Sequence, residues 1–393
     1  MADDTTRADA MTDTAQPSGP ARLQSAELLR ALATVCVVVI HTTHWPGRAL
    51  LYDDIATLSR FAVPAFMLLT GVLLSYRLGA NPLNRGVFLR RRFSRSLIPW
   101  LAWAPVYIVF GWFFDVEPAH TVAGVADYIS YGVGHLWFLL LIPQMYLMFV
   151  VWPRRNLWLW AAAAMALQTT LCIYRLYGTM PPGLVEDFFL WHGFQLLPFW
   201  IGYFAVGVAA GRSLLGRGEP ARVNWLAVAV SAAVAVAGGW LLIAVGYDNA
   251  PHAGFREGTG GFLLPLEPVF VLGIVAVVWL VGRSVLELGG GIAWVSRRLS
   301  DNSLGVYILH PMLVYAIGRP LLGALNSGLA GSLVSFLALT AWGLGAATLT
   351  SIALSRTPLA IAVGMRWRPP RQPRSRLASA APRGGEGAPR TRA

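Results

Sequence analysis

The stretch RALATVCVVVIHTTH, from Arg30 to His44, decides the fold. It belongs to an apolar run that is long enough to cross a membrane, yet it carries an arginine at one end and two histidines at the other. Ionisable groups inside a membrane span are costly, and they usually face a cavity, a partner or a functional site. The stretch therefore predicts a membrane helix with a chemical role.

The rest of the chain has the composition of an integral membrane protein. Its 393 residues are 56% hydrophobic and 13% charged, with a mean hydropathy of +0.55, whereas soluble domains average about 25% charged residues. The net charge of +12 comes from arginine alone, because the sequence contains no lysine. These arginines stand between apolar runs, so they indicate membrane topology and a lipid bilayer as partner, and no nucleic acid is expected.

Runs of about 20 largely apolar residues predict an all-α fold, a polytopic membrane helix bundle of about ten transmembrane helices. The expected spans are approximately 27–45, 58–77, 96–114, 133–152, 157–175, 194–211, 223–246, 262–282, 303–318 and 329–354.

The arginine distribution supports this topology. With a cytoplasmic N-terminus, 25 arginines fall on the cytoplasmic side, five fall outside, and Arg30 lies within the first span. This bias predicts that both termini are cytoplasmic and that the protein resides in the plasma or inner membrane. We expect a disordered N-terminal segment (1–21), one ten-helix transmembrane domain (22–365) and a disordered, Arg- and Pro-rich cytoplasmic tail (366–393).

Arg30 and His41 share one face of the first predicted helix. They are eleven residues apart, which at 3.6 residues per turn is about 20° past three full turns, and their axial separation is roughly 16 Å. Arg30 is thus expected near the cytoplasm and His41 in the outer half of the membrane. Glu27, three residues before Arg30, is a candidate ion-pair partner. Without further support, a snorkelling arginine and a hydrogen-bonded histidine explain the pair equally well.

A second basic cluster, FLRRRFSRSLIPW, precedes the third predicted span. If a helix begins there, Arg92 and Arg95 present adjacent guanidinium groups, which suit phosphate recognition. The alternative is that the whole cluster is a topology signal.

Other polar groups are predicted to converge on the outer half of the bundle. GHLWFL places His135 and Trp137 at the outer end of the fourth span, and Glu267 lies just inside the eighth. In the ninth span, Ser303, Tyr307 and His310 form an i, i+4, i+7 stripe, with Asp301 just before the helix. Tyr307 and His310 are expected nearer the middle of the membrane. Interhelical hydrogen bonding is the competing interpretation for each of these residues.

Taken together, these residues resemble acyltransferase family 3, the integral-membrane O-acyltransferases of bacterial surface glycans and of some secreted sugars. The similarity rests on RALATVCVVVIH, FAVPAFMLLTGVLL, the RxxR of Arg92 to Arg95, GHLWFL and SLGVYILHP, in family order over roughly residues 22–355. The chain departs from the pattern in two places. Glu27-Leu28-Leu29-Arg30 stands where many members have Asp-Gly-Leu-Arg, and Thr70-Gly71 where Ser-Gly is common.

The resemblance implies a reaction and a division of roles. An acyl group, by default acetyl, would pass from cytoplasmic acyl-CoA to a hydroxyl of a polysaccharide, lipid-linked saccharide or sugar-containing metabolite. Arg92 and Arg95, with Arg30, would bind the CoA phosphates. His41 would act as general base, because an unperturbed histidine has a pKa of about 6.5, with Arg30 and Glu267 in the catalytic group. The resemblance also places His135, Trp137, Tyr307 and His310 around the acceptor cavity.

Several alternatives stay open at the level of sequence. A multi-pass transporter or flippase for a lipid-linked sugar or small organic acid also uses intramembrane Arg, His and Glu. His41 and His44 have chelating spacing but no nearby carboxylate in sequence, so no metal is expected. The acceptor, the acyl length, a covalent acyl-enzyme, the oligomeric state and the role of the tail are not determined.

Overall fold

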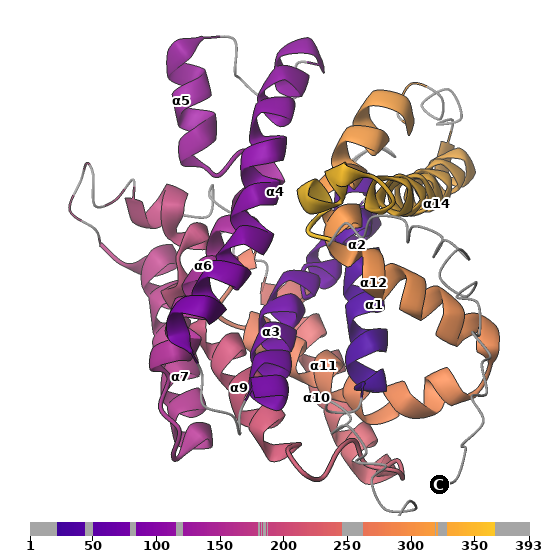
Figure 1. Cartoon of the computed structure of the whole chain (residues 1–393). Coiled ribbons are helices and arrows are strands. Elements are labelled where there is room, and N and C mark those ends of the chain that lie inside the picture. The colour runs from indigo at the N-terminus through magenta and orange to yellow at the C-terminus, as the bar shows by residue number, and fades with distance from the viewer. Residues whose placement is uncertain are drawn as a thin grey trace, which may run out of the picture.

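The computed structural model of the chain describes residues 22–43, 50–78, 84–114, 121–179, 181, 183, 186, 188–245, 262–318, 320 and 328–365. Every regular element among them is a helix (Figure 1). The predicted fold class, a polytopic helical bundle, is confirmed. The segments 1–21 and 366–393, which the sequence predicts to be disordered, lie outside the described residues, and so does His44.

The α-helices, in chain order, share a largely apolar composition. They are α1 (Gln24–Thr42), α2 (Leu50–Ser59), α3 (Ala62–Leu78), α4 (Arg85–Phe114), α5 (Val122–Ser130), α6 (Trp137–Val151), α7 (Leu157–Tyr177), α9 (Ile201–Ser213), α10 (Trp225–Val245), α11 (Glu267–Glu287), α12 (Gly290–Leu313) and α14 (Gly328–Ser355). The short helices used below are η1 (Gly134–Leu136), η3 (Gly193–Gln195), η4 (Leu197–Phe199), η7 (Val314–Gly318) and η9 (Pro358–Val363).

Eight helical segments of the described residues are long and apolar enough to cross a membrane. They correspond to eight of the ten expected spans. In this comparison α2 and α3 together form one segment, and α5 and α6 together form another. The other two expected spans differ in form. The span expected at 194–211 begins with the short turns η3 and η4, where Pro198 interrupts regular helix, and continues as the 13-residue α9.

The span expected at 303–318 lies inside a longer helix. α12 begins at Gly290 and passes directly into the π-helix η7. Asp301 was expected before this helix, and that prediction is wrong, because Asp301 lies within α12. Hydropathy alone starts this span too late, because Arg297 and Asp301 lower the mean hydropathy of the first part of α12. In the folded chain these two side chains form ion pairs with Glu27 and Arg22.

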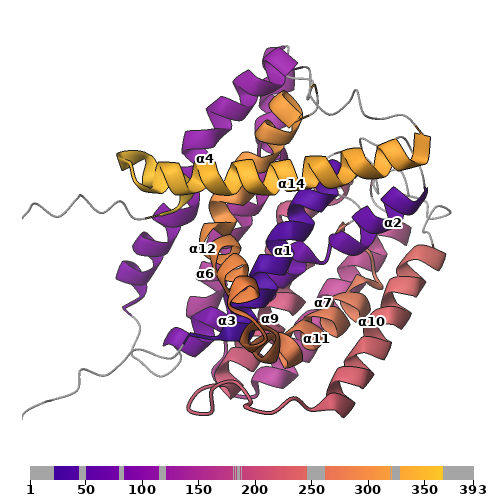
Figure 2. The ribbon, with the colours of Figure 1, turned by 90° about the vertical axis from the view of Figure 1, so that its right-hand side faces the viewer.

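α1 lies at the centre of the bundle. It contacts α2, α3, α11, α12 and α14, and Figure 2 shows α14 crossing the face formed by α1 and α12. The first backbone amides of a helix lack intrahelical acceptors, and those of Gln24 and Ser25 both donate to the carboxylate of Glu219, at 2.8 Å each. The loop after α9 therefore caps the N-terminus of the helix that carries Arg30 and His41.

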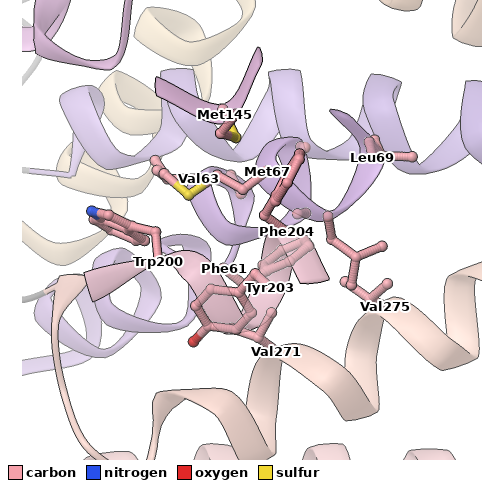
Figure 3. Close-up of a cluster of buried hydrophobic side chains, with 14 of the residues drawn as sticks. Phe61, Val63, Met67, Leu69, Met145, Trp200, Tyr203, Phe204, Val271 and Val275 are labelled. Carbon is pink, nitrogen blue, oxygen red and sulfur yellow. The ribbon is translucent and has the colours of Figure 1, made fainter. Parts of the chain in front are cut away.

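α3 and α9 pack with their backbones almost in contact. A Cβ built on Gly71 would lie 2.8 Å from the backbone nitrogen of Val208, and one on Gly211 would lie 2.8 Å from the Cα of Val72. Small residues at such crossings allow the close van der Waals packing that holds membrane helices together. Neighbouring side chains of α3, α6, α9 and α11 fill the space beside this crossing (Figure 3). This tightly packed region supports the helices on which the candidate site is built.

Candidate active site

A cavity of about 490 Å³ opens at the end of α1 that carries His41. We call it the outer pocket. Its lining is mostly aromatic, with two histidines and one arginine among the described residues. The lining residues are Val37, Ile40, His41, Arg60, Val63, Tyr128, Tyr131, Gly134, His135, Trp137, Phe138, Trp191, Phe194, Phe262, Tyr307 and Tyr315. An apolar cavity with a few convergent polar groups is the usual form of a small-molecule site.

Three histidines from three different helical elements meet beside this pocket. The ring centroid of His41 lies 4.9 Å from that of His310 and 6.1 Å from that of His135, and the latter two are 5.8 Å apart. His310 is fully buried, and its ring packs edge to face against that of His41. The predicted convergence of these histidines is confirmed, whereas the position of His310 nearer the middle of the membrane stays a prediction.

Hydrogen bonds fix the orientation of His310. Its Nδ1 lies 2.9 Å from the carbonyl oxygen of Val306, one turn earlier in α12. A carbonyl can only accept, so Nδ1 carries the proton and Nε2 presents a lone pair in the neutral ring. The buried Nε2 atoms of His310 and His135 have no hydrogen-bond partner within the part of the chain that the structure describes. The Nε2 acceptor of His310 thus lies on a ring that packs against the imidazole of His41, and His135 adds a second imidazole beside it.

A strained turn holds His135 at the pocket. Gly132, Val133 and Gly134 have φ values of 80°, 64° and 57°, three consecutive left-handed residues before η1. Glycine adopts this conformation easily, whereas for a β-branched valine it costs about 1–3 kcal/mol. The Val133 side chain is completely buried against Leu136 and its neighbours, which offsets that cost. Such strain is commonly retained where it positions a functional group.

Two tyrosines tie α12 to this turn and to α4. The hydroxyl of Tyr307 donates to the backbone carbonyl of His135. The hydroxyl of Tyr107 donates to the backbone carbonyl of Ile308 at 2.6 Å, and its ring lies 4.7 Å from that of His135. Tyr107 is a site residue that the sequence does not reveal, since a single tyrosine in the apolar run of α4 carries no distinctive pattern.

A second, smaller cavity of about 150 Å³ extends the outer pocket towards the other end of the bundle. We call it the inner chamber. The two cavities share Val37, Val63, Phe138 and Tyr307 as lining residues, so they adjoin. The remaining residues of the chamber are Phe66, Thr70, Ile142, Ser303 and Leu304. All of them lie further from the His41 end along their own helices.

Arginines gather beyond the inner chamber, around Tyr146 of α6. Arg30, Arg92 and Arg95 all interact electrostatically with this tyrosine. The guanidinium carbon of Arg92 lies 5.7 Å from the ring centroids of both Phe88 and Tyr146, within cation–π range. Arg30 and Arg92 are half-buried, whereas Arg95 is exposed. We call Arg30, Arg92 and Arg95 the arginine cluster.

The structure bears out the shared face of Arg30 and His41. Arg30 interacts with Tyr146 in α6, and His41 lies against His135, which directly precedes α6. Both side chains therefore face the same neighbouring helix at different depths. Arg92 and Arg95 also lie on one helix, as adjacent guanidinium groups require, because α4 starts at Arg85 and contains both residues.

Acidic side chains near Arg30 have other partners. Glu27, the candidate partner of Arg30, binds Arg22 at 2.6 Å and Arg297 at 3.3 Å. Asp301 also binds Arg22, at 2.9 Å. Both carboxylates also interact electrostatically with Arg30, so they lie near one edge of the arginine cluster while forming their ion pairs with Arg22 and Arg297.

Glu267 lies apart from the histidines. It is buried in the first turn of α11 and does not line the outer pocket. It interacts electrostatically with Arg60, which does line the pocket, and also with Tyr203 and Cys172. Of these three partners, Arg60 is the one that lines the outer pocket. Arg60 is a second residue that sequence reasoning missed, because it was counted only as one of the external arginines.

No group of three or more His, Cys, Asp and Glu among the described residues has a geometry that could hold a metal ion. The histidine rings meet edge to face instead. Both cysteines lie in the described part of the chain, and they form no disulfide.

Comparison with known proteins gives one match. A family model described as an acyltransferase domain matches residues 23–356, which run from the turn before α1 to the residue after α14. Among curated proteins and among solved structures, none matches the chain. The matched region contains the outer pocket, the inner chamber and the arginine cluster.

Proposed function

Because the chain belongs to the acyltransferase 3 family of multi-pass membrane proteins, we propose that it moves an acyl group, by default acetyl, from cytoplasmic acyl-CoA to a hydroxyl of a saccharide acceptor. The acceptor is a cell-surface polysaccharide, a lipid-linked saccharide or a secreted sugar-containing metabolite. The observation that carries this proposal is the continuity of two cavities. One holds His41, and the other extends towards the arginine cluster.

The arginine cluster is the proposed donor anchor. Phosphates of CoA carry several negative charges, and guanidinium groups bind phosphate through paired, charge-assisted hydrogen bonds. The buried ring of Tyr146 packs against Arg92 and so helps to hold its guanidinium in place. With the phosphates bound there, the pantetheine arm would pass through the inner chamber. Arg30 and His41 differ in depth by roughly 16 Å at 1.5 Å per residue, which is the distance that the arm has to cover.

His41 is the proposed general base. It would accept the proton of the acceptor hydroxyl while the hydroxyl oxygen attacks the thioester carbonyl carbon. The tetrahedral intermediate then collapses with cleavage of the carbon–sulfur bond, and the proton on His41 passes to the leaving thiolate of CoA. The products are the O-acyl ester and free CoA. The Nε2 lone pair of His310, whose ring centroid lies 4.9 Å from that of His41, would help to stabilise the transient positive charge on His41.

The aromatic lining of the outer pocket favours a saccharide acceptor. The C–H faces of pyranose rings are apolar and pack against aromatic rings, while the hydroxyl groups need only a few polar partners. Trp137 and Trp191 both line this pocket. Trp137 stacks on Trp200 with ring centroids 5.7 Å apart, which holds its ring in place.

The experiment that tests this function measures products rather than binding. Purified protein in lipid nanodiscs is given acetyl-CoA labelled on the acetyl group, together with a panel of saccharides. We expect protein-dependent release of the CoA thiol and an equal amount of labelled saccharide ester. A transporter or flippase would release no thiol, so the absence of thiol release in a preparation that binds acetyl-CoA would overturn the proposal.

A further inference from the structure

Arg60 brings a positive charge to the wall of the outer pocket. It lies in the turn between α2 and α3, where its backbone N–H contacts the carbonyl oxygens of Ala56 and Thr57 at 3.2 Å each. Its guanidinium carbon lies 5.5 Å from the ring centroid of Phe262, another lining residue. Among the described residues that line this pocket there is no aspartate or glutamate. Among the described lining residues, Arg60 is therefore the one side chain with a fixed charge.

The position of Arg60 separates it from the proposed donor path. The inner chamber is lined by Val37, Val63, Phe138 and Tyr307 in common with the outer pocket, but not by Arg60. Arg60 precedes Val63 by about one helical turn, on the side away from the arginine cluster. An acyl-CoA that reaches His41 through the inner chamber has its phosphates at the far end. Arg60 thus lies on the acceptor side of the outer pocket rather than on the donor path.

The surroundings of Arg60 favour a strong interaction with an anion. The guanidinium lies against an aromatic ring, and its Nε atom is buried, so water screens it less than it would an exposed arginine. Glu267 interacts with Arg60 from behind the pocket wall, where it is buried in the first turn of α11. Glu267 therefore interacts electrostatically with the Arg60 guanidinium but does not itself line the cavity.

We propose that the outer pocket takes an anionic saccharide, and that Arg60 binds its carboxylate or phosphate while a hydroxyl of the same sugar faces His41. This inference rests on the proposed acyltransferase function. The guanidinium of Arg60 can form paired, charge-assisted hydrogen bonds with a planar carboxylate or with a tetrahedral phosphate. The acceptor class is thereby narrowed to acidic glycans or to sugars that carry a phosphate next to the acylated unit.

The test measures saccharide binding in protein that cannot consume the acceptor. The His41→Ala protein in nanodiscs is titrated by calorimetry with methyl β-glucoside, methyl β-glucuronide and methyl β-glucoside 6-phosphate. We expect at least one anionic sugar to bind about tenfold to a hundredfold more tightly than the neutral one, as one charge-assisted contact predicts. The carboxylate and phosphate sugars show which anion is preferred. Adding Arg60→Gln should abolish the difference, and Arg60→Lys should retain part of it.

Arg283→Gln is the matched control. Arg283 forms an exposed i, i+4 ion pair with Glu287 in α11, away from the pocket lining, so the preference should be unchanged. Three outcomes overturn the inference: the neutral sugar binds as tightly as both anionic sugars, neither anionic sugar binds, or Arg60→Gln weakens neutral and anionic sugars equally. Thiol release by the wild-type protein, measured in the same preparation, shows independently whether the acyltransferase function itself holds.

Discussion

Replacing His41 with alanine should lower acyl transfer by about 10²–10⁴-fold, the usual loss when a general base is removed. The reason is geometric, because His41 lines the outer pocket and lies beside the imidazoles of His135 and His310, whose buried Nε2 atoms have no hydrogen-bond partner in the described structure. Donor binding should be almost unchanged, since the arginine cluster lies at the other end of α1. The loss should therefore appear in kcat at saturating acetyl-CoA.

His192 provides the matched control for this experiment. It is a described histidine that does not line the outer pocket, and it stacks on Tyr131 with ring centroids 5.0 Å apart. The His192→Ala protein should keep its activity within a few-fold, which excludes a general effect of deleting a ring near the cavity. Full activity of a folded, membrane-inserted His41→Ala protein would show that another group accepts the proton.

Replacing Arg92 or Arg95 with alanine should raise the donor KM and leave kcat nearly unchanged. One charge-assisted contact to phosphate corresponds to a change of about tenfold to a hundredfold. Arg92 should show the larger effect, because it is half-buried against Phe88 and Tyr146, whereas Arg95 is exposed and more strongly screened. The measurement is a steady-state titration with acetyl-CoA at a fixed acceptor concentration.

Arg90 and Arg91 serve as controls on the same helix. Both are exposed residues of α4, and they contribute the same charge to membrane topology. Their alanine variants should therefore leave the donor KM unchanged. If none of the four alanine variants raises the donor KM, the basic segment acts only as a topology signal, and the donor phosphates bind elsewhere.

The sequence predicted the faces of individual helices well, and the meeting points between helices less well. Spacing alone placed Arg30 and His41 on one face, because helical periodicity is a local property. The distance of 4.9 Å between the rings of His41 and His310 depends on how α1 packs against α12. Packing between helices far apart in the chain leaves no periodic signal in one sequence, so this distance could not be predicted.

Helix ends were mispredicted where charged residues extend a helix beyond its apolar part. α12 begins at Gly290, and α4 begins at Arg85 rather than near residue 96. Hydropathy excludes such polar turns, although Arg297 forms a tertiary ion pair with Glu27 of α1. Glu27 interacts electrostatically with Arg30, as predicted, but its ion pair with Arg297 could not be predicted, because only the folded chain brings Arg297 within reach.

Residues with ordinary local patterns were missed altogether. Tyr146 and Tyr107 lie in apolar runs, where an aromatic residue is unremarkable in sequence, yet one joins the arginine cluster and the other packs on His135. Arg60 was assigned to topology because its contact with the pocket depends on the turn between α2 and α3. By contrast, His41, His135 and Trp137 stood within motifs and were placed correctly at the outer pocket.

The central claim is that one donor molecule spans the distance from the arginine cluster to His41. A cryo-EM structure of the protein in nanodiscs with a thioether analogue of acetyl-CoA tests it most directly. We predict phosphate density within hydrogen-bond distance, about 2.7–3.2 Å, of Arg92 or Arg95. The pantetheine arm should occupy the inner chamber, and the acyl group should lie beside His41. A bound analogue whose acyl group lies outside the outer pocket, or whose phosphates lie away from the arginine cluster, would contradict the proposed path.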